Sequence, residues 1–147
     1  MKEFLSKKLA STQGHIKDTS GKILGTHPGA LYYTIGQREG LGLSGGPRFV
    51  VEKDVQRNEL IVGHEDDPRL WTTQVKCTDR HRIGEIPELP KKAQVKLRYR
   101  QPDQCATLEL VKDMLQITFD IPQKAATPGQ IAVAYDGDVL LGSGVIL

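Results

Sequence analysis

Glycine and proline interrupt this chain so often that the pattern favours strands and turns over helices. Its 147 residues include 15 glycines and 8 prolines, and the apolar runs between them are short. Short apolar runs bounded by turn residues are typical of β-strands. Residues 1–11 differ, because Phe4, Leu5 and Leu9 predict the apolar face of a short amphipathic helix. The sequence therefore predicts a mainly β fold with a short helix at its start.

A break at Asp66-Asp67-Pro68 divides the chain into two parts. Before the break we expect two strand pairs, residues 15–17 with 22–24 and residues 48–53 with 59–62. After residue 70 come six further strand-like runs, and six short strands separated by turns suggest a small closed barrel or sandwich. We therefore predict a small mixed α/β central domain over residues 1–70 and a six-stranded antiparallel β-barrel over residues 71–147.

Charge and cysteine content exclude several classes of function. Lys and Arg number 20 and Asp and Glu 18, and a net charge of +2 does not by itself indicate nucleic-acid binding. Cys77 and Cys105 lie far apart, and neither they nor the histidines have metal-site spacing. This cysteine usage suggests a reducing compartment, so we expect a cytoplasmic protein. We find neither a signal peptide nor a long apolar run, and we expect no membrane partner.

Residues 40–45 read G-x-G-x-x-G, the fingerprint of a dinucleotide-binding loop. Such a loop leaves a buried strand and enters a helix, whose N-terminal amides hold the pyrophosphate. Here Gly46 and Pro47 follow at once, and residues 49–51 have the composition of a strand. We therefore expect a flexible glycine-rich turn here and no nucleotide-binding loop.

The run from Ala93 to Arg100 is the most informative strand. Alternation along it predicts an apolar inner face (Val95, Leu97, Tyr99) and a basic outer face (Lys96, Arg98, Arg100). A basic stripe on a sheet suits a phosphate backbone. An ordinary solvated strand face explains the same pattern equally well.

Cys77 and His81 are the candidates for a nucleophile and its base. Position parity puts both side chains on one strand face, but too far apart for a hydrogen bond. We therefore expect Cys77 to be a packed or surface thiol and Cys105 to be structural. An enzyme that used Cys77 would need a thiol of low pKa.

Six groups of residues resemble, in their order, the signature of one family. They are residues 27–29 (HPG), 33–42 (YTIGQREGLG), Val50-Val51 with Lys53-Asp54 and Asn58, 98–101 (RYRQ), 126–130 (ATPGQ), and 135–137 (YDG) with 141–144 (LGSG). The family is that of the tRNA-specific 2-thiouridylases, or tRNA-uridine 2-sulfurtransferases, and the resemblance covers nearly the whole chain.

The resemblance implies an enzyme that activates C2 of the wobble uridine of tRNA with ATP and then delivers sulfur through a cysteine persulfide. In that family an adenylating domain precedes a central domain and a C-terminal β-barrel, and this chain resembles only the last two. The family's Ser-Gly-Gly-x-Asp-Ser loop has no match here, and neither Cys77 nor Cys105 matches a catalytic cysteine. We therefore expect part of a longer protein, with no catalytic residue or cofactor in this chain. ATP would bind the missing domain, and a sulfur-donor protein would serve the whole enzyme.

What carries over from the resemblance is tRNA binding. In the family the Arg-Tyr of RYRQ and the Gln of TPGQ contact tRNA, which implies this role for Arg98, Tyr99 and Gln130. Alternation turns Tyr99 inward, unless it lies at the end of its strand or its ring reaches the rim. Weaker candidates for tRNA contacts are Lys96, Arg100, Gln37 and Arg38. The alternative is a stand-alone β-barrel module, like those of translation factors, that binds RNA or protein.

Overall fold

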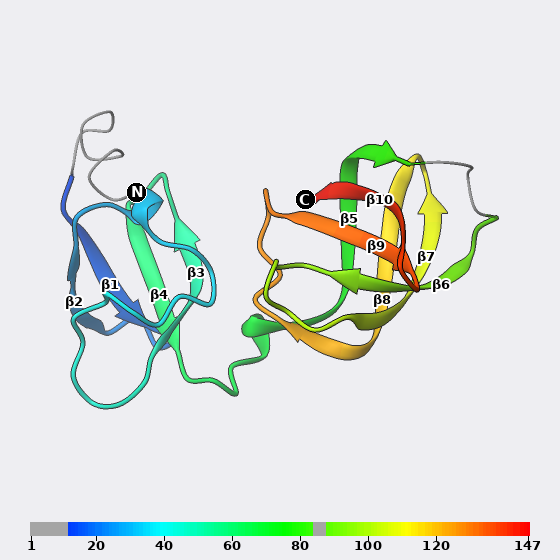
Figure 1. Ribbon diagram of the computed structural model, residues 1–147. Coiled ribbons are helices and arrows are strands. Elements are labelled where there is room, and N and C mark those ends of the chain that lie inside the picture. The colour runs from blue at the N-terminus through cyan, green and yellow to red at the C-terminus, as the bar shows by residue number, and fades with distance from the viewer. Residues whose placement is uncertain (1–11, 84–87) are drawn as a thin grey trace. The chain divides into compact units, whose positions relative to one another are not determined.

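The computed structural model describes residues 12–83 and 88–147 (Figure 1). The expected helix over residues 1–11 and part of the loop over residues 86–90 lie outside the described residues. The chain forms two compact units, Met1–Leu70 and Trp71–Leu147, which we call the first unit and the barrel unit. Among the described residues, no helix is long and apolar enough to cross a membrane.

The first unit contains a four-stranded sheet with the order β2-β1-β4-β3. Its strands are β1 (Gly14–Asp18), β2 (Ile23–His27), β3 (Phe49–Asp54) and β4 (Glu59–Gly63). β1 pairs antiparallel with β2, and β3 with β4, as the turn residues predict, whereas β1 pairs with β4 in parallel. Parallel neighbours need a long connection, and here it includes β2, the 3-10 turn η1 (Ala30–Tyr32), a glycine-rich loop and β3.

The glycine-rich loop, residues 34–48, is anchored on the core of this unit. Tyr33 and Leu41 are buried and pack in the same cluster as the fully buried Leu60 of β4. The Tyr33 hydroxyl donates a hydrogen bond to the carbonyl oxygen of Gly40 at 3.2 Å. The loop then enters strand β3 and not a helix, as the sequence predicts, so the surroundings of a dinucleotide-binding loop are not present here.

The barrel unit is a closed antiparallel barrel with the strand order β10-β5-β8-β7-β6-β9. A second 3-10 turn, η2 (Pro68–Leu70), leads into it. The strands are β5 (Trp71–Arg82), β6 (Lys91–Lys96), β7 (Gln104–Val111), β8 (Met114–Lys124), β9 (Ile131–Asp136) and β10 (Val139–Ile146). The mainly β fold and the six-stranded barrel are thereby confirmed. Among the described residues of the first unit, the regular structure is the four-stranded sheet with two 3-10 turns, η1 and η2.

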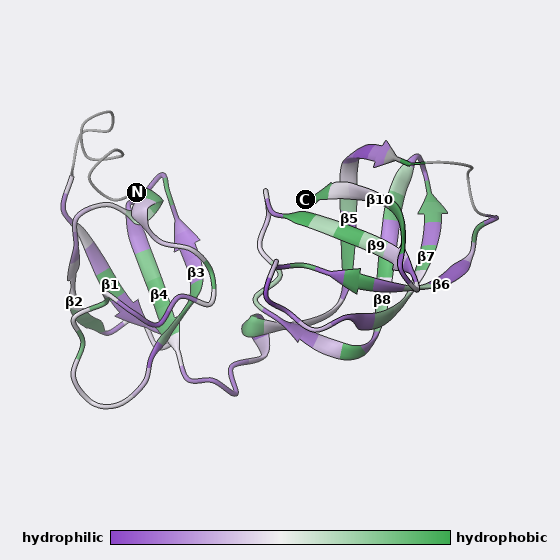
Figure 2. Cartoon of the chain, viewed as in Figure 1, coloured by the Kyte–Doolittle hydropathy of each residue, from purple (hydrophilic) through white to green (hydrophobic). Residues whose placement is uncertain are grey.

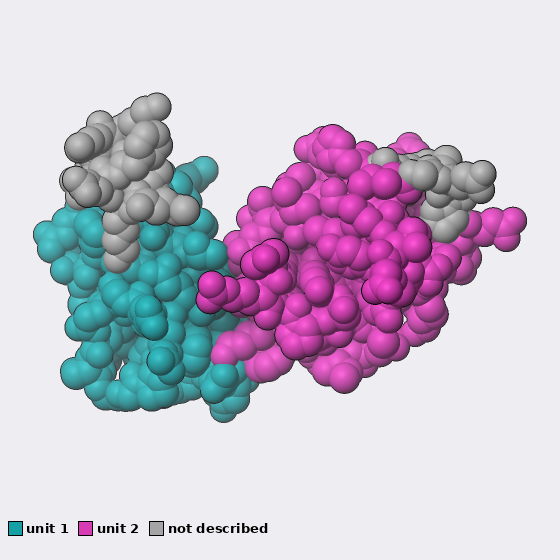
Figure 3. All heavy atoms as spheres, in the orientation of Figure 1, with its two compact units in different colours: residues 1–70 teal, residues 71–147 magenta. Residues whose placement is uncertain are grey.

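Alternating residues of the barrel strands fill its interior. Val95, Ile117 and Cys77 are almost completely buried, and the small Ala106 and Ala132 are buried in the same cluster. Figure 2 shows hydrophobic and hydrophilic residues succeeding one another along these strands. Each unit has its own buried cluster, and Figure 3 draws the atoms of the two units in different colours.

The predicted shared face of Cys77 and His81 is wrong. Cys77 has no exposed surface, whereas His81 is exposed. Between them Asp79 has a φ of 44°, and the pairing of β5 with β10 shifts register at this point. A bulge adds one residue to the strand, so the alternation of faces changes across it.

Candidate nucleic-acid interface

Strand β6 ends at Lys96, and the RYRQ motif lies in the turn that follows. Pairing of β6 with β7 stops at Val95, and its pairing with β9 stops at Lys96. The turn is closed by a hydrogen bond from the Gln101 amide to the carbonyl oxygen of Arg98 at 3.1 Å. The expected strand over residues 93–100 is therefore too long at its carboxyl end.

Tyr99 consequently points into solvent, because it lies beyond the end of its strand, as one of the two alternatives above allowed; the inward orientation that alternation alone predicts is wrong. Its side chain is 96% exposed, whereas Leu97 is buried as predicted. Burial of Leu97 fixes the start of the turn, and the following residues turn outward. An exposed aromatic ring on a fixed turn has a free face on which a nucleic-acid base can stack.

Three glutamines hold this turn against the neighbouring strand. Gln101 accepts a hydrogen bond from the Leu97 amide at 3.2 Å and donates one to Oε1 of Gln123 at 2.6 Å. Gln123 is 4% exposed, and it donates in turn to Gln104 at 3.1 Å and to the carbonyl oxygen of Ile121 at 2.7 Å. The network is local and polar, so no hydrophobic pattern in the sequence indicates it.

Arg98 connects the turn to the loop between β8 and β9. Its Nη2 donates a hydrogen bond to the carbonyl oxygen of Ala125 at 2.8 Å, and the Thr127 hydroxyl donates to the same oxygen at 3.0 Å. Arg98 is exposed and forms no ion pair with any described residue. One edge of its guanidinium is thus fixed by protein, while the positive charge stays available to an anion.

Gln130 lies at the end of the same loop, where the backbone holds it firmly. Its amide donates to the carbonyl oxygen of Thr127 at 3.1 Å, and its carbonyl oxygen accepts from the Ile146 amide at 2.8 Å. The side-chain oxygen Oε1 is buried and has no hydrogen-bond partner among the described residues. A buried acceptor without a partner is costly, so a ligand that donates a hydrogen bond there would be favoured.

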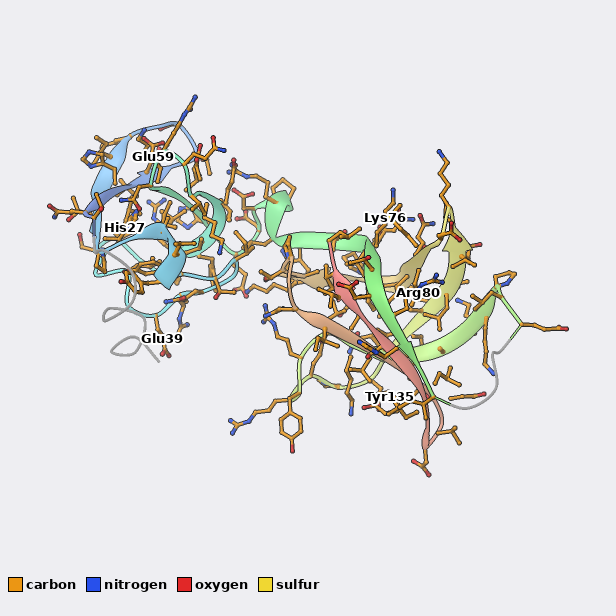
Figure 4. All side chains as sticks on the ribbon, turned by 90° about the horizontal axis from the view of Figure 1, so that it is seen from above. His27, Glu39, Glu59, Lys76, Arg80 and Tyr135 are labelled. Atoms are coloured by element: carbon orange, nitrogen blue, oxygen red, sulfur yellow. The ribbon has the colours of Figure 1, made fainter. Side chains whose placement is uncertain are left out.

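These side chains meet in one cleft of about 620 Å³, which we call the Arg98 cleft. The sequence-predicted residues that line it are Lys96, Arg98, Tyr99 and Gln130. Ile131, Val133 and Tyr135 of β9 also line it, although no sequence pattern assigned a binding role to them. Figure 4 labels Tyr135 on the barrel unit. Tyr135 belongs to the YDG motif, so the sequence marks this residue, but it does not indicate that the side chain lines a cleft.

The basic outer face is partly neutralised by acids from neighbouring strands and loops. Lys96 forms an ion pair with Asp103 at 3.3 Å, and its Nζ lies 5.7 Å from the ring centre of Tyr135. Lys91 pairs with Asp136 and Lys92 with Asp120, at 2.7 and 2.6 Å. Arg100 is exposed and forms no ion pair within residues 12–83 and 88–147, but it does not line the cleft. The available positive charge is therefore concentrated in Arg98 and Arg100.

The two weaker candidates of the first unit have different surroundings. The side chain of Gln37 is used within its own loop, because Oε1 accepts from the Thr34 amide at 3.2 Å and Nε2 donates to the carbonyl oxygen of Glu39 at 2.8 Å. Arg38 is exposed and lines another cleft, together with Arg48. Gln37 thus has a clear structural role, whereas Arg38 has a free charge.

The two cysteines lie in different environments. Burial raises the pKa of the Cys77 thiol to about 11, whereas Cys105 is an exposed free thiol. The described residues contain no group of three or more His, Cys, Asp or Glu side chains that could hold a metal ion. A buried thiol with a raised pKa is a poor nucleophile.

Two family models match the chain. Residues 2–64 match the tRNA methyl transferase PRC-barrel domain, and residues 72–146 match the aminomethyltransferase β-barrel domain. Each model corresponds closely to one of the two compact units.

Curated relatives named tRNA-specific 2-thiouridylase MnmA match the same residues. The protein of Pseudomonas fluorescens is 44% identical over 152 residues, which cover 98% of this chain and 40% of the relative. That of Pseudoalteromonas translucida is 46% identical over 154 residues, covering 99% of this chain and 42% of the relative. The chain thus spans about 40% of the length of the first of these relatives. It belongs to the tRNA-specific 2-thiouridylase family, whose central and C-terminal barrel domains its two units represent.

Proposed function

We propose that this chain binds and positions tRNA as part of a tRNA 2-thiouridylase. The whole protein would adenylate and thiolate C2 of the wobble uridine, with ATP bound outside this chain and sulfur supplied by a donor protein in the cytoplasm. The observation that carries the proposal is the meeting of Arg98, Tyr99 and Gln130 in one cleft, although they come from two separate sequence motifs.

The three side chains offer complementary contacts to RNA. The guanidinium of Arg98 can bind a phosphate oxygen, and the exposed ring of Tyr99 can stack on an unpaired base. The buried Oε1 of Gln130 can accept a hydrogen bond from a base amine or a ribose hydroxyl. Single-stranded or looped RNA suits this combination better than a continuous duplex does, because its bases are accessible for stacking.

The chain alone is proposed to have no sulfur-transfer activity. The thiol of Cys77 is buried in the barrel and keeps its proton at neutral pH. A persulfide relay needs a thiolate that a donor protein can reach. This argument concerns Cys77, and the family resemblance assigns no catalytic position to Cys105.

Binding of a transfer RNA with a glutamate, lysine or glutamine anticodon over a series of salt concentrations tests the proposal. We expect Arg98→Gln to weaken binding and to lower the slope of log affinity against log salt by about one, as loss of one phosphate contact does. Tyr99→Ala should weaken binding by about 1–3 kcal/mol without changing the slope, because stacking releases no counterions.

Lys112→Gln provides the matched control, because Lys112 is exposed in the turn between β7 and β8 and does not line the cleft. This variant loses the same charge and should bind tRNA almost like the parent chain. Equal effects of Arg98→Gln and Lys112→Gln would mean that Arg98 acts only through the net charge of the chain, and this would contradict the proposal. So would a full-length enzyme that thiolates tRNA normally with both Arg98 and Gln130 replaced by alanine.

A further inference from the structure

A second cleft, of about 410 Å³, lies on the glycine-rich loop of the first unit. Arg38 and Arg48 line it, together with Gly40, Gly42 and Gly46. We call it the Arg48 cleft. The sequence pattern here resembles a nucleotide-binding fingerprint, but the strand that follows rules out the usual helix. The combination of glycines and arginines in this loop therefore has a cause other than dinucleotide binding.

The two arginines of this cleft, Arg38 and Arg48, form no ion pair within the described part of the chain. A hydrogen bond from Ser20 is the main cause that lowers the pKa of Asp18, and the charge of Arg48 contributes only weakly. The carboxylate of Asp18 instead accepts hydrogen bonds from the amide and hydroxyl of Ser20 and from the Lys22 amide, at donor–acceptor distances of 2.6–3.0 Å. Two cationic side chains thus border one cleft without a carboxylate partner.

Arg48 also carries an unused hydrogen-bond donor. Its Nε is buried and has no partner among the described residues. An unpaired buried donor on a charged group costs free energy, and an anion that accepted a hydrogen bond from it would remove this cost. Arginine is well suited to such a ligand, because its planar donors match the oxygens of a phosphate.

The backbone of the loop is open to a ligand. Gly42, Gly45 and Gly46 have φ values of 66°, 90° and 101°, and a Cβ on any of them would meet no atom within 4 Å. No amide of residues 41–48 donates a hydrogen bond to another described residue. Unpaired amides in turns of this kind bind anions in proteins.

We propose that the Arg48 cleft binds one phosphate of an RNA backbone, as a contact separate from the Arg98 cleft. The choice of RNA as the source of the phosphate rests on the proposed function. The lining residues include no aromatic ring for a base and no carboxylate for a ribose, so a backbone phosphate fits the cleft better than a mononucleotide does. Glu39, labelled in Figure 4, follows Arg38 in sequence but does not line the cleft.

Nuclear magnetic resonance of the nitrogen-15-labelled chain tests the cleft directly. The signals to follow are the amides of Gly42, Gly45 and Gly46 and the Nε–H of Arg48. The three ligands are a five-nucleotide RNA, inorganic phosphate and AMP. We expect the RNA to shift these signals at a concentration about tenfold lower than inorganic phosphate or AMP, because a phosphate within a charged strand carries counterions that its binding releases, whereas a free phosphate or AMP carries few.

The double variant Arg38→Gln/Arg48→Gln should lose the response of the three glycine amides. Lys22→Gln/Arg57→Gln is the matched control, because both residues are exposed in the same unit and outside the cleft, and it should keep the response. Unchanged signals from the rest of the first unit in both variants establish that the fold is intact.

Each outcome separates this inference from the proposed function. RNA-induced shifts around Arg98 without shifts in the glycine-rich loop overturn the inference and leave the proposed function standing. Shifts in the loop at equal concentrations of RNA, AMP and inorganic phosphate overturn the assignment to an RNA backbone. If the Lys22→Gln/Arg57→Gln control also loses the response, the shifts depend on net charge alone and the inference is overturned. If no signal shifts at either cleft, both the inference and the proposed function are overturned.

Discussion

Cys77 and Cys105 lie in the same barrel but in opposite environments. Cys77 has no exposed surface, and burial raises its pKa to about 11, whereas Cys105 at the start of β7 is exposed. At neutral pH the Cys77 thiol therefore keeps its proton. The two thiols thus differ in access: Cys77 packs in the barrel interior, whereas Cys105 is open to solvent.

Alkylation of the native chain with iodoacetamide at pH 7 should therefore modify Cys105 and spare Cys77. The measurement is mass spectrometry of peptides over time, with Cys105 as the internal reference. In denaturant both thiols should react at similar rates, because the difference comes from burial in the folded state. Equal rates in the native chain would revive the hypothesis that Cys77 is a nucleophile.

At the scale of elements, the connection between β6 and β7 depends on a buried glutamine. Gln123 of β8 joins Gln101 in the turn to Gln104 at the start of β7. Hydrogen bonds to backbone and side chains on both sides make this turn a defined platform for Arg98 and Tyr99.

Gln123→Leu should destabilise the fold by about 1–3 kcal/mol, because it removes the hydrogen-bond partner of the half-buried side chains of Gln101 and Gln104. Urea unfolding measures this effect. Gln116→Leu is the control on the same strand, because Gln116 makes only a weak contact with Glu109 at 3.5 Å. Equal losses of stability in the two variants would show that the network does not fix the turn.

Sequence alone predicted most strands but not where β6 ends. Val95, Leu97 and Tyr99 alternate perfectly, yet a strand also requires hydrogen-bonded neighbours, and both neighbours of β6 stop at or before Lys96. Alternation reports the faces of a strand and cannot report where its partners stop. The bulge at Asp79 was hidden for the same reason, because it depends on pairing with β10.

The candidate site was predictable in its residues but not in its geometry. The family motifs identified Arg98, Tyr99 and Gln130, and the structure places all three on one cleft. The contact of Arg98 with the Ala125 carbonyl oxygen has no counterpart in the sequence pattern. Every residue has a backbone carbonyl oxygen, so the sequence does not indicate which of them accepts a hydrogen bond from a side chain. Such hydrogen bonds are identified only in the structure.

At the scale of the whole molecule, the two units have separate cores and separate candidate sites. The barrel has its own buried cluster, and its six strands form a closed order. We therefore expect residues 71–147 to fold without the first unit. The measurement is urea unfolding with amide spectra, in which the barrel signals should match those of the whole chain.

Residues 71–138, which lack β10, serve as the comparison and should not fold. Removal of β10 exposes edges on β5 and β9, because β10 lies between them. An unfolded 71–147 piece would contradict the expected independence of the barrel. A folded 71–138 piece would contradict the importance of closure.

The position of β10 also has a consequence during protein synthesis. β10 pairs with β5, the first barrel strand, and it is the last of the six in chain order. At about 5–20 residues per second, one edge of β5 waits for several seconds before its partner is made. During that time the nascent chain presents an unpaired strand edge in the crowded space around the ribosome, where a neighbouring nascent chain can pair with it.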